Sequence, residues 1–176
     1  MARRILAAAA VVVVGIGLCA QAQEGANFSG TWVMDMTRSE SAAQASNDSP
    51  RIPVRLEITH SPSAVTIRTL RDGSAETISY SFDRPSQDIV KTTGDNSTER
   101  KVINANARWD GPILVTQTVY SVNNMATTKV DKYRLSAGGR EMIVESELQM
   151  QHGFESNGRG PAGYSTAKDV YVKDSR

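Results

Sequence analysis

About ten short segments of alternating apolar and polar residues follow one another through this chain of 176 residues. The alternation is clearest in residues 52–60 and 78–82, where every second side chain is apolar. Short turns separate the segments, and Asp72-Gly73 is a strong hairpin signal. No segment has a convincing helical pattern, although 39–46 could form a short helix within a polar loop over 36–51. Consecutive hairpins predict an antiparallel up-and-down meander.

A meander of this length is expected to roll up. The twist of successive strands accumulates, and an open sheet would leave two unpaired edges. Pairing of the last strand, 165–173, with the first strand, 28–35, would remove both edges. We therefore predict an all-β fold of about ten strands that forms a closed barrel, or a strongly curved half-open barrel if closure is incomplete.

The first of these strands carries a large aromatic residue beside a glycine. Phe28, Gly30, Trp32 and Met34 fall on one face of it. Trp32 offers a large apolar area, and Gly30 allows another group to approach closely. We expect Trp32 to plug one end of the barrel.

The run Phe28-Ser-Gly-Thr-Trp32 at the head of such a meander resembles the opening of the calycins, the lipocalins and the fatty-acid-binding proteins, in which Gly-x-Trp lies on the first strand. With Asp35 and Ser39 following, it is similar to exported bacterial lipocalin-like proteins. The resemblance implies a calycin-like barrel with Gly30 and Trp32 as its structural plug. Two features depart from the pattern. The polar stretch 36–51 is a poor match for the helix pair of fatty-acid-binding proteins, and no lipocalin-type helix is expected after 165–173.

The N-terminus reads as a secretory signal peptide. Arg3 and Arg4 precede an apolar run, and Ala20-Gln21-Ala22 supplies a cleavage site, so we predict a leader over 1–22 and one barrel domain over 23–176. The run is roughly 15 residues long, whereas a membrane span needs about 20. An uncleaved anchor is the alternative. Lipidation of Cys19 is disfavoured because a large residue precedes it. The expected location is periplasmic or secreted.

Charge and composition exclude several partners. Without the leader, 18 basic residues face 19 acidic ones, with no basic block. Nucleic acid binding needs clustered Lys and Arg, so we expect none. No membrane span is expected after cleavage, and a protein partner is not identified.

We expect neither a metal, nor a cofactor, nor catalysis. His60 and His152 belong to separate hairpins and were expected to be solvated, whereas zinc needs three or four converging ligands. No Gly-x-Ser-x-Gly elbow is present. Glu145 and Glu147 share a strand face, which we interpret as the solvated face, with Lys129 and Lys132 or Arg134 as cross-strand partners.

The remaining candidate site is a cavity inside the barrel. Ala105 and Ala107 are small enough to leave space, or they could only make room for Trp32 or Trp109. The candidate cavity residues are Trp32, Tyr80, Phe82, Ala105, Ala107, Val144 and Met150. Other positions expected to face inward are Met34, Leu56, Ile58, Val65, Ile67, Ile78, Ile103 and Leu148.

Two features of this cavity stay open. A shift of one residue would instead turn Asn104, Asn106 and Arg108 inward and make the interior polar. Phe154 and Arg159, in a glycine-rich loop over 152–163, are candidate lid residues.

The function predicted is that of an exported lipocalin-like barrel that binds a small, partly apolar ligand in its interior, without catalysis. One alternative is a solid barrel that acts as an envelope interaction or structural module. A hydrolase or isomerase with a dispersed site is a third.

Overall fold

A computed structural model describes residues 26–43, 53–84, 91–93, 101–122, 125–150 and 164–175. The predicted leader and the candidate lid residues Phe154 and Arg159 lie outside this part of the chain. The described elements are β1 (Gly30–Met34), α1 (Glu40–Ala43), β2 (Arg55–His60), β3 (Ala64–Arg71), β4 (Ser74–Ser81), β5 (Lys91–Thr93), β6 (Lys101–Asp110), β7 (Ile113–Val122), β8 (Met125–Leu135), β9 (Glu141–Met150) and β10 (Tyr164–Lys173).

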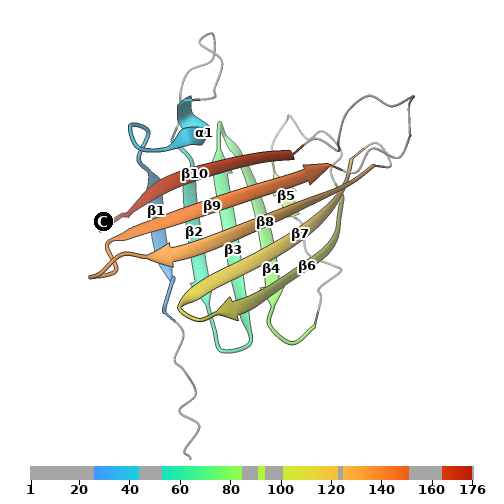
Figure 1. The fold of residues 1–176 in the computed structure, drawn as a ribbon, viewed down its shortest axis with the longest axis horizontal. Helices are drawn as coiled ribbons and strands as arrows, with labels where there is room; N and C mark the ends of the chain where they lie inside the picture. The colour runs from blue at the N-terminus through green and yellow to red at the C-terminus, as the bar shows by residue number, and fades with distance from the viewer. Residues whose placement is uncertain are drawn as a thin grey trace, which may run out of the picture.

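Nine strands form a closed ring in the order β1-β2-β3-β4-β6-β7-β8-β9-β10, and β10 pairs back onto β1. Trp32 of β1 lies opposite Lys173 of β10. In Figure 1, β1 to β4 run across the direction of β6 to β10, so the ring is a barrel with two crossing walls. The predicted closure of the last strand onto the first is confirmed.

The wall departs from a simple meander between β4 and β6. These strands pair in parallel at Ser81 and Asn106, while the three-residue β5 pairs with the other end of β4, where Ala75 faces Thr93. A strand of three residues is too short to span the barrel wall, so β6 takes the next place in the ring. The predicted all-β fold of about ten strands is confirmed, with nine strands in the closed ring and the short β5 beside β4.

The hairpin between β3 and β4 has the predicted chemistry. Asp72 and Gly73 have φ values of 47° and 73°. Positive φ at both central residues is the type I′ geometry that matches the twist of the flanking strands. The predicted Asp-Gly hairpin is confirmed.

A β-bulge in β6 sets which residues of this strand face the interior. The register shifts between Val102 and Asn104, so Val102, Ala105 and Ala107 are all buried. The extra residue reverses the alternation, which leaves Ile103 exposed at 45%. The expectation that Ile103 faces inward was wrong for this reason.

An aromatic cluster fills the end of the barrel where the β2–β3 and β6–β7 turns lie. Phe82 stacks on Trp109 at 5.9 Å between ring centroids, and His60 lies 5.5 Å from Trp109. Phe28 contacts Trp109 and Tyr133, and its carbonyl accepts a 2.9 Å hydrogen bond from Trp32 Nε1. His60 is half-buried and so less solvated than expected, because its ring packs among these aromatic residues, and burial lowers its pKa. We call this the closed end.

Helix α1 lies at the opposite end of the barrel, beside β10 (Figure 1). The Ser39 hydroxyl accepts a hydrogen bond from the Val170 amide and donates one to its carbonyl. Ser41 donates from its amide and hydroxyl to Asp169, at 2.9 and 2.6 Å. The possible short helix is confirmed. Its Ala42 is 5% exposed and belongs to the core.

Candidate functional site

The inner wall formed by β6 to β10 carries a continuous row of small and polar side chains. Strand register brings together, in order around the wall, Ala107, Thr116, Asp131, Ser146 and Ala167. Cross-strand neighbours on one face have Cβ atoms about 5 Å apart, so the row is contiguous. We call it the Asp131 row.

Asp131 is a buried carboxylate at the centre of this row, with its side chain 4% exposed. Its Oδ1 accepts a 2.5 Å hydrogen bond from Ser146 Oγ, and its Oδ2 accepts one of 2.7 Å from Lys129 Nζ. Removing a carboxylate from water costs several kcal/mol unless it is paired and hydrogen-bonded. The two contacts stabilise the charge in the barrel wall.

The next row, farther from the closed end, contains Ala105, Thr118, Lys129 and Leu148. The Tyr80 hydroxyl lies 3.0 Å from Thr118 Oγ1. Because β6 lies between β4 and β7 in the ring, Tyr80 reaches across β6, where Ala105 stands opposite Thr118. The small side chain of Ala105 therefore accommodates Tyr80, rather than Trp32 or Trp109.

Three interior tyrosines remain protonated at neutral pH. Burial is the main cause that raises the pKa of Tyr80, Tyr133 and Tyr171, and the negative charge of Asp131 contributes in each case. A neutral phenol can donate as well as accept a hydrogen bond. The interior hydroxyl groups can therefore act as hydrogen-bond donors or acceptors toward a bound molecule.

Two buried side-chain oxygens of the described residues lack a hydrogen-bond partner, and one of them lies in the Asp131 row. This is Thr116 Oγ1, on a fully buried residue opposite Asp131. The Thr116 hydroxyl lies near enough to the Tyr133 hydroxyl to lower its pKa as a weak hydrogen-bond partner, but the contact falls outside the distance and angles of a full hydrogen bond. The other is Asn104 Oδ1, beside the bulge of β6. An unsatisfied buried hydroxyl costs about 1–3 kcal/mol, so Thr116 is an open contact for a ligand.

The candidate cavity residues divide between two regions of the barrel. Tyr80, Ala105 and Ala107 lie at the Asp131 row or the row beside it, and Val144 lies opposite Tyr133 toward the closed end. Trp32 is fully buried. Phe82 stacks within the closed-end cluster. The side chain of Met150 is not among those described.

Sequence reasoning missed most of the polar site. Thr116, Thr118 and Asp131 were not singled out, and Lys129 was expected on the outer face as a cross-strand partner of the glutamates of 141–147. Lys132 stands opposite Glu145, as expected, whereas Lys129 stands opposite Leu148 and faces inward. The alternation along β7 and β8 could have indicated that these polar residues face inward. Thr116 shares a strand face with Leu114, and Asp131 shares one with Tyr133.

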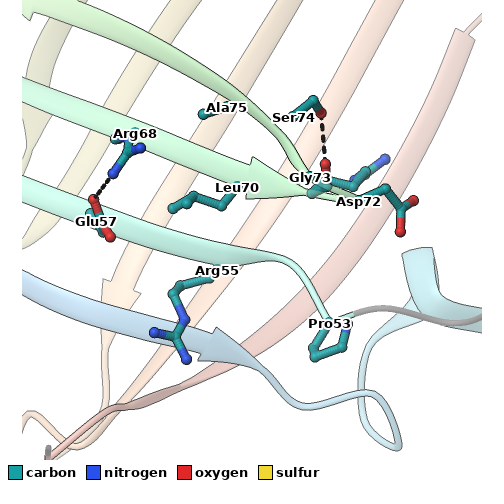
Figure 2. Close-up of a pocket in the computed structure, with 10 residues that line it drawn as sticks. Pro53, Arg55, Glu57, Arg68, Leu70, Asp72, Gly73, Ser74 and Ala75 are labelled. Atoms are coloured by element: carbon teal, nitrogen blue, oxygen red, sulfur yellow. Dashed lines mark hydrogen bonds and ion pairs between the residues drawn. The ribbon is translucent and has the colours of Figure 1, made fainter. Parts of the chain in front are cut away.

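A hollow lies on the outer face of β2 and β3 (Figure 2). It encloses about 540 Å³ and is lined by Pro53, Arg55, Glu57, Arg68, Leu70, Arg71, Asp72, Gly73, Ser74 and Ala75. Arg68 pairs with Glu57 at 2.8 Å, and Arg55 pairs with Asp174 at 3.5 Å. These arginine side chains are 46% exposed, so salt screens their charges and water competes for them. The outer hollow is a poorer candidate than the interior.

Two other features are absent from the described part of the chain. It contains no cluster of three His, Cys, Asp or Glu side chains able to hold a metal ion. No described helix has the length and apolarity needed to cross a membrane.

Known proteins support the fold. No protein-family model and no curated protein sequence matches the chain. An abundant heat soluble (SAHS) protein from Ramazzottius varieornatus has a similar crystal structure, with a TM-score of 0.50 and 17% identity over 86% of this chain and 98% of that one. The fold is a calycin-like barrel.

Two further solved structures have lower TM-scores. The REP1-NXSQ fatty acid transporter matches with a TM-score of 0.49 and 14% identity over 83% of this chain and 95% of its own. A mutant of the fluorescent protein UnaG matches with a TM-score of 0.46 and 13% identity over 85% and 97%. At these identities the likeness concerns the calycin-like fold alone.

Proposed function

We propose that this calycin-like barrel binds a small, partly apolar molecule in its interior, at the Asp131 row, and does so without catalysis. The observation that carries the proposal is the placing of a buried carboxylate and an unpartnered Thr116 hydroxyl on an inner wall built from small side chains. Ligand sites are typically apolar hollows with a few converging polar groups.

The distribution of side chains around the row supports a ligand of mixed polarity. The closed end is packed with aromatic rings, from Phe28 to Trp109. The middle of the wall instead carries Ala107 and Ser146, which have small side chains. A purely structural barrel gains more from well-packed apolar side chains than from a buried ion pair. The inner wall has polar groups where a solid barrel would have packed apolar side chains. This favours a binding role over that of a solid interaction module.

Export is a second part of the proposal and depends on residues 1–22. An n-region with Arg3 and Arg4, an apolar stretch and a site after Ala22 are what a signal peptidase accepts. N-terminal sequencing of the protein recovered from outside the cytoplasm tests it. A chain that begins at Gln23 is expected, and a chain that retains the leader would contradict the proposal.

Titration with the neutral fluorescent dye N-phenyl-1-naphthylamine tests interior binding. Wild-type protein is expected to bind the dye, and Ala107→Leu to weaken binding by about tenfold or more, because the added methylenes fill the wall beside Thr116. Ser146→Val provides a second interior change if Ala107→Leu folds poorly. Ile103→Thr, on the outer face of the same strand, is the matched control and should bind as wild type. No binding by wild type, or equal binding by the interior and outer variants, would overturn the proposal.

A further inference from the structure

Lys129 and Asp131 form an asymmetric ion pair. Their side chains are 38% and 4% exposed, respectively. The Lys129 stem starts one row farther from the closed end than Asp131, and its ammonium reaches back to the carboxylate at 2.7 Å. The lysine can return its charge to water by rotating a flexible side chain, whereas the aspartate is fixed in the wall and held by Ser146.

The two charged side chains that are buried in the described part of the chain, Asp131 and Asp169, are both acidic. Asp131 and Asp169 both raise the pKa of Tyr171, and Asp131 and Glu76 raise that of Tyr80. Arg71 acts in the opposite sense on Tyr171. Attraction between opposite charges is strong in such a low-dielectric interior, and so is repulsion between like charges.

We propose that the interior ligand carries a protonated amine. In the unliganded barrel, the ammonium of Lys129 occupies the position beside Asp131 that the ligand amine would take. The inference rests on the proposed function and names the chemical class of the ligand. A ligand ammonium would displace Lys129 toward solvent and leave Asp131 paired throughout.

An anionic ligand has no equivalent route. A ligand carboxylate could bind only by sharing the Lys129 ammonium with Asp131, which keeps its negative charge and its hydrogen bond from Ser146. The incoming anion would also lie beside Asp131, whose charge repels it. The wall therefore selects against fatty-acid-like anions.

Thr116 gives a second and independent indication. Its Oγ1 is buried, lacks a partner and stands opposite Asp131 on the adjacent strand. An ammonium group has three donors. A ligand amine on Asp131 therefore has a donor left for Thr116, to which the Lys129 ammonium makes no hydrogen bond.

Competition for bound N-phenyl-1-naphthylamine tests the ligand class with three probes of equal chain length: dodecylamine, dodecanol and dodecanoate. At neutral pH the amine is protonated and the acid ionised. Dodecylamine is expected to displace the dye at a concentration about tenfold lower than dodecanoate, with dodecanol between them. All three are used below the concentration at which they form micelles.

Asp131→Asn should reduce the advantage of dodecylamine over dodecanol about tenfold, with each competitor measured against the dye affinity of the variant itself. Glu145→Gln makes the same change of charge on the outer face of β9 and should keep the wild-type order. If Asp131→Asn fails to fold, the order of the three probes on the wild type decides the matter.

Dodecanoate as the strongest competitor, or an unaltered order in Asp131→Asn, would overturn the amine inference while dye binding, and thus the proposed function, still stood. Failure of the wild type to bind the dye would remove both.

Discussion

The Tyr80 hydroxyl lies 3.0 Å from Thr118 Oγ1, although β6 separates their strands in the barrel. Only a small residue on the inner face of β6 leaves room for this contact, and Ala105, which is fully buried, occupies that position. The contact ties two non-adjacent strands beside the weakest stretch of the wall, where β4 and β6 pair in parallel at Ser81 and Asn106.

Ala105→Leu is therefore expected to destabilise the protein by about 1–3 kcal/mol, because the larger side chain competes with Tyr80 for the same space. Urea denaturation measures the change. Ile103→Val, at an exposed position of the same strand, should change the free energy of unfolding by less than about 0.5 kcal/mol. Equal effects of the two changes would show that the placement of the Tyr80 side chain does not require a small residue at position 105.

Gly30→Ala should destabilise the barrel by about 1–3 kcal/mol. Gly30 has a φ of 133°, which side-chain-bearing residues rarely adopt, and a Cβ there would lie 2.9 Å from Lys173 Cε. The same lysine places its ammonium 5.2 Å from the centre of the Trp32 ring. Chemical denaturation of the variant checks the prediction.

The Lys173→Ala background separates the two causes. The steric part of the Gly30→Ala effect should disappear there, while the backbone strain should remain. A Gly30→Ala protein as stable as wild type would argue against both the strained backbone and the close approach of Lys173.

Alkaline titration should reveal the interior tyrosines. The pKa values of Tyr80, Tyr133 and Tyr171 are raised above their usual value of 10.0, mainly by burial. A raised pKa in the folded state means that stability is intact below 10.0 and is lost as the pH rises above it, because the unfolded chain then releases more protons.

Tyrosinate absorbance is the readout. Of the five tyrosines in the chain, at least these three should ionise only when the protein unfolds, as a cooperative step that coincides with the loss of β-sheet circular dichroism. Smooth ionisation of all five near the normal pKa, with the fold intact, would contradict their burial.

Acid should weaken the closed end through His60. Burial lowers the pKa of His60 below its usual 6.5, so the folded state favours the neutral ring. Stability from this residue is fully present above 6.5 and is lost as the pH falls through the lower, folded-state pKa.

His60→Phe keeps a ring beside Phe82 and Trp109 but cannot be protonated. Between about pH 7.5 and pH 5, its urea midpoint should fall less than that of wild type. Identical pH dependence in the two proteins would exclude His60 as a source of acid sensitivity.

The overall barrel could be predicted from the sequence because hairpin signals and alternation are local. Asp72-Gly73 specifies its own turn, and the position of Trp32 follows from a simple period of two. The position of Ile103 could not be predicted, because a bulge depends on pairing with β7 and leaves no clear mark in the sequence.

The polar site lay beyond sequence reasoning for a related reason. Asp131 and Lys129 read as surface charges on a strand until the register with β7 and β9 places them opposite Thr116 and Leu148. A one-residue slip would have turned both outward. Buried polar residues are exceptions to the hydrophobic pattern, so the pattern cannot locate them.

The most direct test of interior binding is methyl NMR of alanine-labelled protein during titration with N-phenyl-1-naphthylamine. Ala105 and Ala107 report on the inner wall, and Ala75 reports on the outer hollow between β2 and β3. Binding at the Asp131 row predicts saturable ring-current shifts of the Ala105 and Ala107 methyl signals and none for Ala75. Shifts confined to Ala75, or no saturable shift at Ala105 and Ala107, would contradict it.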